Sequence, residues 1–66
     1  MELLIIKSGK KYIRFKDNNY LFVKLDKASV FPMDQMDAVK KHESLLQEKG
    51  FGNVCIKKLV LTEEDL

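Results

Sequence analysis

The sequence predicts an α+β fold: an antiparallel β-meander of three strands, then one amphipathic helix and a final strand (βββαβ), with the helix packed on one sheet face. Three observations support this order. Side chains in residues 11–25 alternate between two faces around a short polar turn, residues 34–49 carry apolar side chains at helical spacing, and residues 54–61 form an apolar run of strand length. Sixty-six residues allow one small domain, 1–66, in which we expect residues 62–66 to form a frayed acidic tail.

The first strand is expected within residues 2–8, because residues 3–6 are all apolar and of types that pack well on a pleated surface. Both faces of this strand are apolar. It is therefore either covered on both sides or meets another molecule with its open face. Gly9 and Lys10 suit a two-residue turn. That turn predicts three cross-strand pairs, which are Ser8 with Lys11, Ile6 with Ile13, and Leu4 with Phe15.

The second turn is predicted to span residues 17–19. A two-residue loop at Asn18 and Asn19 would place Lys16 on the core face, whereas a three-residue loop keeps this charge out of the core. In the resulting register Ile13, Phe15, Leu21 and Val23 face the core. The opposite face carries Tyr12, Arg14, Lys16, Tyr20, Phe22 and Lys24.

The helix is predicted to begin near Asp34, whose side chain can cap the first turn, and to end at Gly50. At 100° per residue, one arc of this helix gathers its apolar side chains. This arc consists of Ala38, Val39, His42, Leu45 and Leu46. Phe51 is expected to fold back onto the core.

The final strand is expected to return under the helix and to join the sheet beside the first strand. Its alternation of apolar side chains falters at Lys57 and Lys58. Two explanations are equally consistent with this pattern. A β-bulge would bring all the apolar residues to the core, and an edge position would leave both lysines in water.

Several classes of function find no support in the sequence. Cys55 is the single cysteine and His42 the single histidine, so neither an internal disulfide nor a four-ligand zinc site can form within the chain. There is no nucleophile paired with a base and no glycine-rich phosphate loop. We therefore predict a protein that is not an enzyme and binds no metal or cofactor. His42 is interpreted as a partly buried structural residue and Cys55 as a buried small hydrophobe.

Charge is distributed unevenly along the chain. The net charge is only +2, but seven lysine and arginine side chains lie in residues 7–27, and the last residues are acidic. No apolar run approaches the length of about 18 residues that a membrane span needs, and the N-terminus lacks signal-peptide features. We expect a cytoplasmic protein without membrane contact.

One surface has a composition that suggests binding. If the helix covers one face of the sheet, the other face is aromatic, aliphatic and basic. Its residues are Leu3, Ile5, Tyr12, Arg14, Lys16, Tyr20, Phe22 and Lys24. Three interpretations remain open: a protein interface, above all in a homodimer, a single-stranded nucleic-acid surface, and ordinary cross-strand pairing of lysine and arginine with aromatic rings. The aliphatic Leu3 and Ile5 favour the protein interface, so the primary hypothesis is a non-enzymatic, self-associating interaction module.

The segment KYIRFKDNNYLFVKLDKASVFP, followed by an amphipathic helix, resembles a type of small uncharacterised bacterial protein of prophages and other mobile elements. The resemblance covers about half of the chain. It is carried by Lys11, Tyr12 and Ile13 at the start of a strand, and by Lys27 and Ala28 shortly before Phe31. Proteins of this type generally have no assigned activity. The resemblance implies a bacterial cytoplasmic setting and transfers no functional residues.

Overall fold

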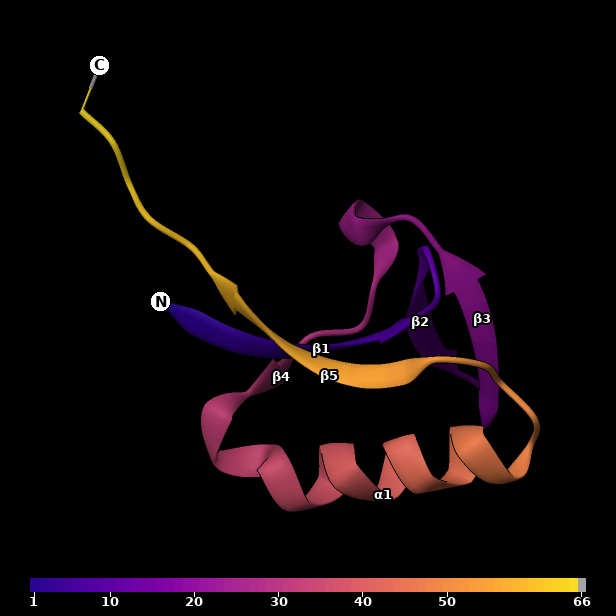
Figure 1. Cartoon of the computed structure of the whole chain (residues 1–66). Helices are drawn as coiled ribbons and strands as arrows, with labels where there is room; N and C mark the ends of the chain where they lie inside the picture. The colour runs from indigo at the N-terminus through magenta and orange to yellow at the C-terminus, as the bar shows by residue number, and fades with distance from the viewer. Residues whose placement is uncertain (66) are drawn as a thin grey trace.

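A computed structural model describes residues 1–65 of the chain as a sheet with a helix packed against it (Figure 1). The helical and extended elements follow one another as β1 (Glu2–Ser8), β2 (Lys11–Lys16), β3 (Asn19–Val23), the 3₁₀ turn η1 (Leu25–Lys27), β4 (Phe31–Pro32), the 3₁₀ turn η2 (Met33–Gln35), α1 (Met36–Glu48) and β5 (Val54–Val60). The predicted α+β class with an antiparallel sheet is confirmed. Within the described residues the sheet has five strands, because the short segment before the helix forms β4.

β1 is the central strand of the sheet. β5 pairs with one edge of β1 along its whole length, from Glu2 opposite Val60 to Ser8 opposite Val54, so the predicted place of the last strand is confirmed. The other edge of β1 is shared. β2 pairs with its C-terminal end and β4 pairs with its N-terminal end, while β3 extends the sheet beyond β2. α1 lies along one side of β1 and β5, and the connector that contains η1 lies on the other side (Figure 1).

The first turn has the predicted length, but β2 separates from β1 sooner than predicted. Gly9 has a φ of 60° and Ser8 lies opposite Lys11, in agreement with a two-residue turn. Past Tyr12, however, Ser29 takes the place of β1 beside β2. Its backbone N–H donates to the Ile13 carbonyl at 3.1 Å, and its hydroxyl accepts from the Phe15 N–H at 2.9 Å. The predicted pairing of Leu4 with Phe15 is therefore wrong, and Leu4 pairs with Phe31.

The second turn is one residue shorter than predicted. Asp17 and Asn18 form it, with φ angles of 53° and 60°, as a turn with two left-handed central residues requires. Asn19 already belongs to β3, and its side-chain amide donates to the Asp17 carbonyl at 3.1 Å. Lys16 then lies opposite Asn19 and stays off the core face. The predicted three-residue loop is wrong, because a two-residue loop at Asp17 and Asn18 also keeps Lys16 off the core face.

This shorter loop turns every side chain of β3 to the face opposite the predicted one. Phe15 pairs with Tyr20, Ile13 with Phe22, Arg14 with Leu21, and Tyr12 with Val23. Residues that pair across an antiparallel ladder share a face. Tyr20 and Phe22 therefore join the buried Ile13 on the side of α1, whereas Leu21 and Val23 lie on the opposite side.

The hydrophobic core lies between the sheet and one stripe of α1. Its buried side chains are Leu4, Ile6, Ile13, Val39 and Leu46. On α1 the prediction is only partly right, because Ala38 and Leu45 are exposed. The helix also begins later than predicted, at Met36, since η2 occupies the preceding residues.

The C-terminal end of α1 matches the prediction. Gly50 has a φ of 90°, a left-handed conformation that glycine adopts without strain. The Phe51 N–H donates back to the Leu46 carbonyl at 3.0 Å, so that Phe51 packs against the core. The Ser8 hydroxyl donates to the Gly52 carbonyl at 2.6 Å and ties this turn to the end of β1.

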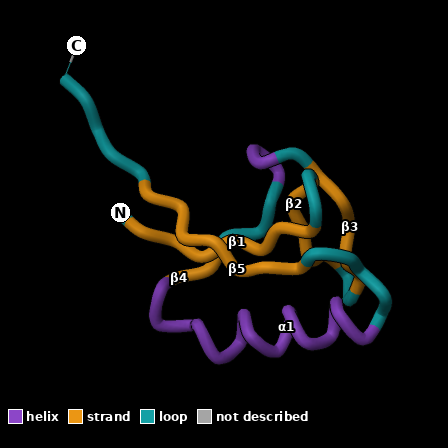
Figure 2. Tube along the Cα trace, in the orientation of Figure 1, coloured by secondary structure: helices purple, strands orange, loops and turns teal. Residues whose placement is uncertain are grey.

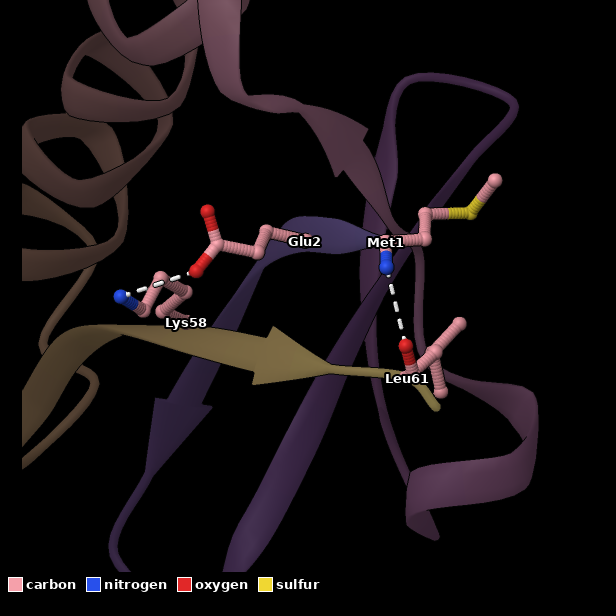
Figure 3. Close-up of polar contacts among 4 residues, drawn as sticks. All are labelled: Met1, Glu2, Lys58 and Leu61. Atoms are coloured by element: carbon pink, nitrogen blue, oxygen red, sulfur yellow. Dashed lines mark hydrogen bonds and ion pairs between the residues drawn. The ribbon is translucent and has the colours of Figure 1, made fainter. Parts of the chain in front are cut away.

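β5 runs without a bulge as an edge strand. Its register with β1 is continuous through Lys57 and Lys58, so these lysines point to opposite faces. Of the two explanations given above, the edge position is confirmed. Lys58 forms an ion pair with Glu2 at 3.1 Å, with both side chains about half exposed (Figure 3).

The positions of Leu45 and Leu46 give a matched test of the core. Leu46 is fully buried, and truncating a buried leucine to alanine costs about 2–5 kcal/mol because it leaves a cavity. Leu45 is 45% exposed and leaves none. We expect Leu46→Ala to lower the free energy of unfolding by that amount and Leu45→Ala to lower it by less than about 1 kcal/mol. Urea unfolding followed by far-UV circular dichroism measures both, and equal losses would contradict this packing.

Candidate interaction surfaces

The structure does not hold the eight residues of the predicted binding face together on one surface. Tyr20 and Phe22 lie on the side of α1, as the register of β3 requires. Tyr12, Arg14 and Lys16 stay on the opposite side, which is called the outer face below. Lys24 is exposed just before η1. The grouping of all eight residues on one face is therefore wrong, because it depended on the longer second turn.

The aliphatic part of the predicted face is also less accessible than expected. Ile5 is only 4% exposed, and Leu3 is half-buried. Leu3 lies between Pro32 and Leu59 in the sheet, because both β4 and β5 pair with β1 at this position. These two side chains belong to the packed structure and do not form an open surface.

On the outer face, Tyr12 is occupied by a residue of the same chain. The ammonium group of Lys7 lies 5.3 Å from the centre of the Tyr12 ring, and the two residues are direct cross-strand neighbours. Such a cation–π contact is worth about 0.5–1 kcal/mol at an exposed site. For Tyr12 the structure thus shows the cross-strand pairing with a lysine that was one of the three open interpretations.

On the side of α1, aromatic rings surround His42. Its Nδ1 atom and the Tyr20 hydroxyl are joined by a hydrogen bond of 2.7 Å. Ring centres of Phe15 and Phe31 lie 4.8 and 5.6 Å from that of His42. Burial raises the pKa of Tyr20, so this phenol keeps its proton at neutral pH. His42 is half-buried, so its predicted partial burial is confirmed.

Sequence reasoning missed the pairing of Tyr20 with His42. The assumed three-residue loop placed Tyr20 on the far side of the sheet from the helix. The signal that could have revealed it is the dipeptide of Asp17 and Asn18, since Asp and Asn tolerate the left-handed conformations of a two-residue hairpin loop.

Exposed apolar side chains remain at two ends of the sheet. At the hairpin end, Phe22 is 56% exposed although its ring centre lies 5.1 Å from that of Phe51, and Leu21 is exposed on the outer face. At the other end, Val60 is 55% exposed, and Met1 and Leu61 are exposed beside it. We call these the hairpin end (Leu21, Phe22) and the β5 end (Met1, Val60, Leu61).

A basic depression lies between β2 and η1. It is lined by Arg14, Phe15, Lys16, Asp26, Lys27, Ala28 and Ser29. Three cations face one carboxylate here, which is an arrangement that can hold an anion weakly. Lys16, Asp26 and Lys27 are exposed and Arg14 is half-buried, so water and salt screen most of these charges.

Other features of the described chain bear on chemistry. Cys55 is half-buried on the outer face opposite Lys7, which is less covered than predicted. In residues 1–65, no group of three or more His, Cys, Asp or Glu side chains comes together in a way that could hold a metal ion. None of the helices described is long and apolar enough to cross a membrane.

The burial of Tyr20 beside His42 predicts a pH effect on stability. Because the pKa of Tyr20 is raised in the folded state, its contribution is complete below about pH 10, the ordinary value, and is lost as the pH rises through the raised value. We expect Tyr20→Phe to cost about 0.5–1.5 kcal/mol at pH 7 through the lost hydrogen bond, and to flatten the fall in stability above pH 10. Urea unfolding between pH 7 and 11 measures both effects. Tyr12→Phe is the control and should keep the parent's fall, because Tyr20 remains.

Comparison of the chain with protein-family models, with curated proteins and with solved structures finds no match. Its function is therefore inferred from its exposed side chains, its strand edges and its charges.

Proposed function

We propose that the protein is a small non-enzymatic interaction module that self-associates as a homodimer. The observation that carries the proposal is the exposure of apolar side chains at both ends of the sheet, where Phe22 and Val60 are each more than half exposed. Contact with a second copy removes such side chains from water, which favours association.

The size of the core supports the same proposal. A chain of this length buries only about 60% of the surface that it exposes when unfolded, so small domains often gain stability by associating. Here five apolar side chains make up the buried core cluster of the described residues. A second copy would add apolar contacts that this core lacks.

Self-association is tested by the mass of the protein in solution. We expect sedimentation equilibrium at high micromolar concentration to give twice the mass of one chain, with dissociation on dilution. Far-UV circular dichroism of the same samples controls for unfolding. A protein that remains monomeric at the highest concentration would rule the proposal out.

The second candidate function is binding of single-stranded nucleic acid at the basic depression. Arg14, Lys16 and Lys27 favour it, since they can contact neighbouring phosphates. Two features weaken it. Tyr20 and Phe22 lie on the side of α1 and not beside these cations, and the Lys7 ammonium group lies over the Tyr12 ring. The stacking part of nucleic-acid recognition therefore has few aromatic rings available on this side of the sheet.

Fluorescence anisotropy with labelled single-stranded RNA and DNA distinguishes the two functions. We expect no saturable binding at about 0.15 M salt, because the depression offers few cations for phosphates and little aromatic surface for stacking. Arg14→Ala/Lys16→Ala serves as the comparison. Binding that weakens with salt and disappears in this variant would favour the nucleic-acid function.

A further inference from the structure

β5 leaves one of its edges open. β1 occupies the other edge, and in the part of the chain that the structure describes no strand pairs with the open one. An edge strand of seven residues without a bulge can accept another strand through its backbone groups. After Val60, residues 61–65 carry no helix or strand and project away from the body of the molecule (Figures 1 and 2).

Two hydrogen bonds determine which backbone groups face this open edge. The Met1 amine donates to the Leu61 carbonyl at 2.9 Å (Figure 3). The Leu61 N–H donates to the Met1 carbonyl at 2.7 Å. Both polar groups of Leu61 thus point toward β1. Because these groups alternate along a strand, those of Lys58 and Val60 point to the open edge, and in a strand that continues those of Thr62 and Glu64 do so too.

Two copies that pair antiparallel at this edge must therefore match even-numbered residues with even-numbered residues in the hydrogen-bonded pairs. Odd-numbered residues then lie opposite odd-numbered residues in the pairs between them. One such register places Leu61 opposite Leu61 of the second copy. Lys58 then lies opposite Glu64 of the second copy, and Lys57 lies opposite Asp65, with each pair occurring twice by symmetry. The two lysines of each copy thus lie opposite two acidic residues of the other copy.

Neighbouring registers match the charges less well. With Val60 opposite itself, Lys58 meets Thr62, and of the two lysines only Lys57 meets an acidic residue. With Lys57 opposite itself, two like charges are brought together, which is destabilising. Lysines on an edge strand generally deter pairing with other strands. Here the lysines disfavour the register with Lys57 opposite itself and favour the register that pairs them with the acidic residues after β5.

We propose that the open edge of β5 and the acidic residues that follow it pair antiparallel with the same segment of a second copy, with Leu61 at the two-fold axis. This inference rests on the proposed self-association and names the surface that carries it. The two sheets join into one continuous sheet, and the hairpin ends stay free.

The surroundings of β5 are compatible with this contact. Val60, which is exposed in the single chain, lies beside the axis and is covered in the pair, as is Leu61. The core contacts β5 through Val54 and Ile56, at the other end of the strand. The ion pair of Lys58 with Glu2 is half exposed and therefore weak, so Lys58 can also contact a second carboxylate.

Charge reversal tests the register. Glu64→Lys/Asp65→Lys replaces four attractive pairs by four repulsive ones, and we expect the dissociation constant of the dimer to rise about tenfold or more. Adding Lys57→Glu/Lys58→Glu restores opposite charges and should bring it back toward the parent value. Asp26→Lys/Glu48→Lys changes the net charge equally at exposed positions outside β5 and should leave it unchanged. Sedimentation equilibrium measures all four proteins.

A pair of proline variants tests the backbone contact. Thr62→Pro removes an N–H that, in this register, donates to Val60 of the second copy, whereas Glu63→Pro removes an N–H that points the other way. Neither residue belongs to β5, so the fold of the single chain is retained. We expect the dissociation constant to rise at least about tenfold for Thr62→Pro and to change less than about threefold for Glu63→Pro.

The outcomes separate this inference from the proposed function. A monomeric parent overturns both. A dimer that withstands Glu64→Lys/Asp65→Lys and Thr62→Pro, but is lost in Phe22→Glu, overturns the β5 contact and leaves self-association in place. A dimer weakened by the reversal but not restored by the compensating change overturns the register. Weakening, restoration and the difference between the two prolines together support the proposal.

Discussion

The two left-handed residues of the second turn, Asp17 and Asn18, determine how the sheet meets the helix. With this turn, Tyr20 points toward α1, where it forms a hydrogen bond with His42, and Phe22 reaches Phe51 just after the helix. Lengthening the turn by one residue would exchange the two faces of β3 and remove both contacts. The attachment of the hairpin to the helix thus depends on backbone angles at two exposed positions.

Much of the architecture could be predicted from the sequence because its signals are local. Gly9 indicated the first turn, Gly50 the end of the helix, and the apolar run at Val54 the last strand. The second turn could not be decided in the same way. Two loop lengths both keep Lys16 off the core face, and side-chain parity alone does not distinguish them. Tyr20 and Phe22 were placed on the wrong face for this reason, since both follow the turn.

The register of β3 splits the predicted binding face between the two sides of the sheet, and this changes which kind of partner the chain suits. Stacked bases need several aromatic rings beside cations, and the register of β3 separates Tyr20 and Phe22 from Arg14. The most exposed apolar side chains of the sheet, Met1, Phe22 and Val60, lie at its two ends. At one of these ends, backbone groups, apolar side chains and charges of both signs follow one another along a single segment. A second copy of that segment supplies the complement of each, which favours a symmetric pair.

The shared edge of β1 has a consequence for how the molecule moves. Because β2 departs after Tyr12 and Ser29 fills the gap, the hairpin is joined to the central strand by a short ladder, whereas β5 follows that strand for its full length. The sheet therefore consists of two units of unequal strength. Local opening should begin with the hairpin swinging away from the helix as one piece, with the β1 and β5 ladder still closed behind it.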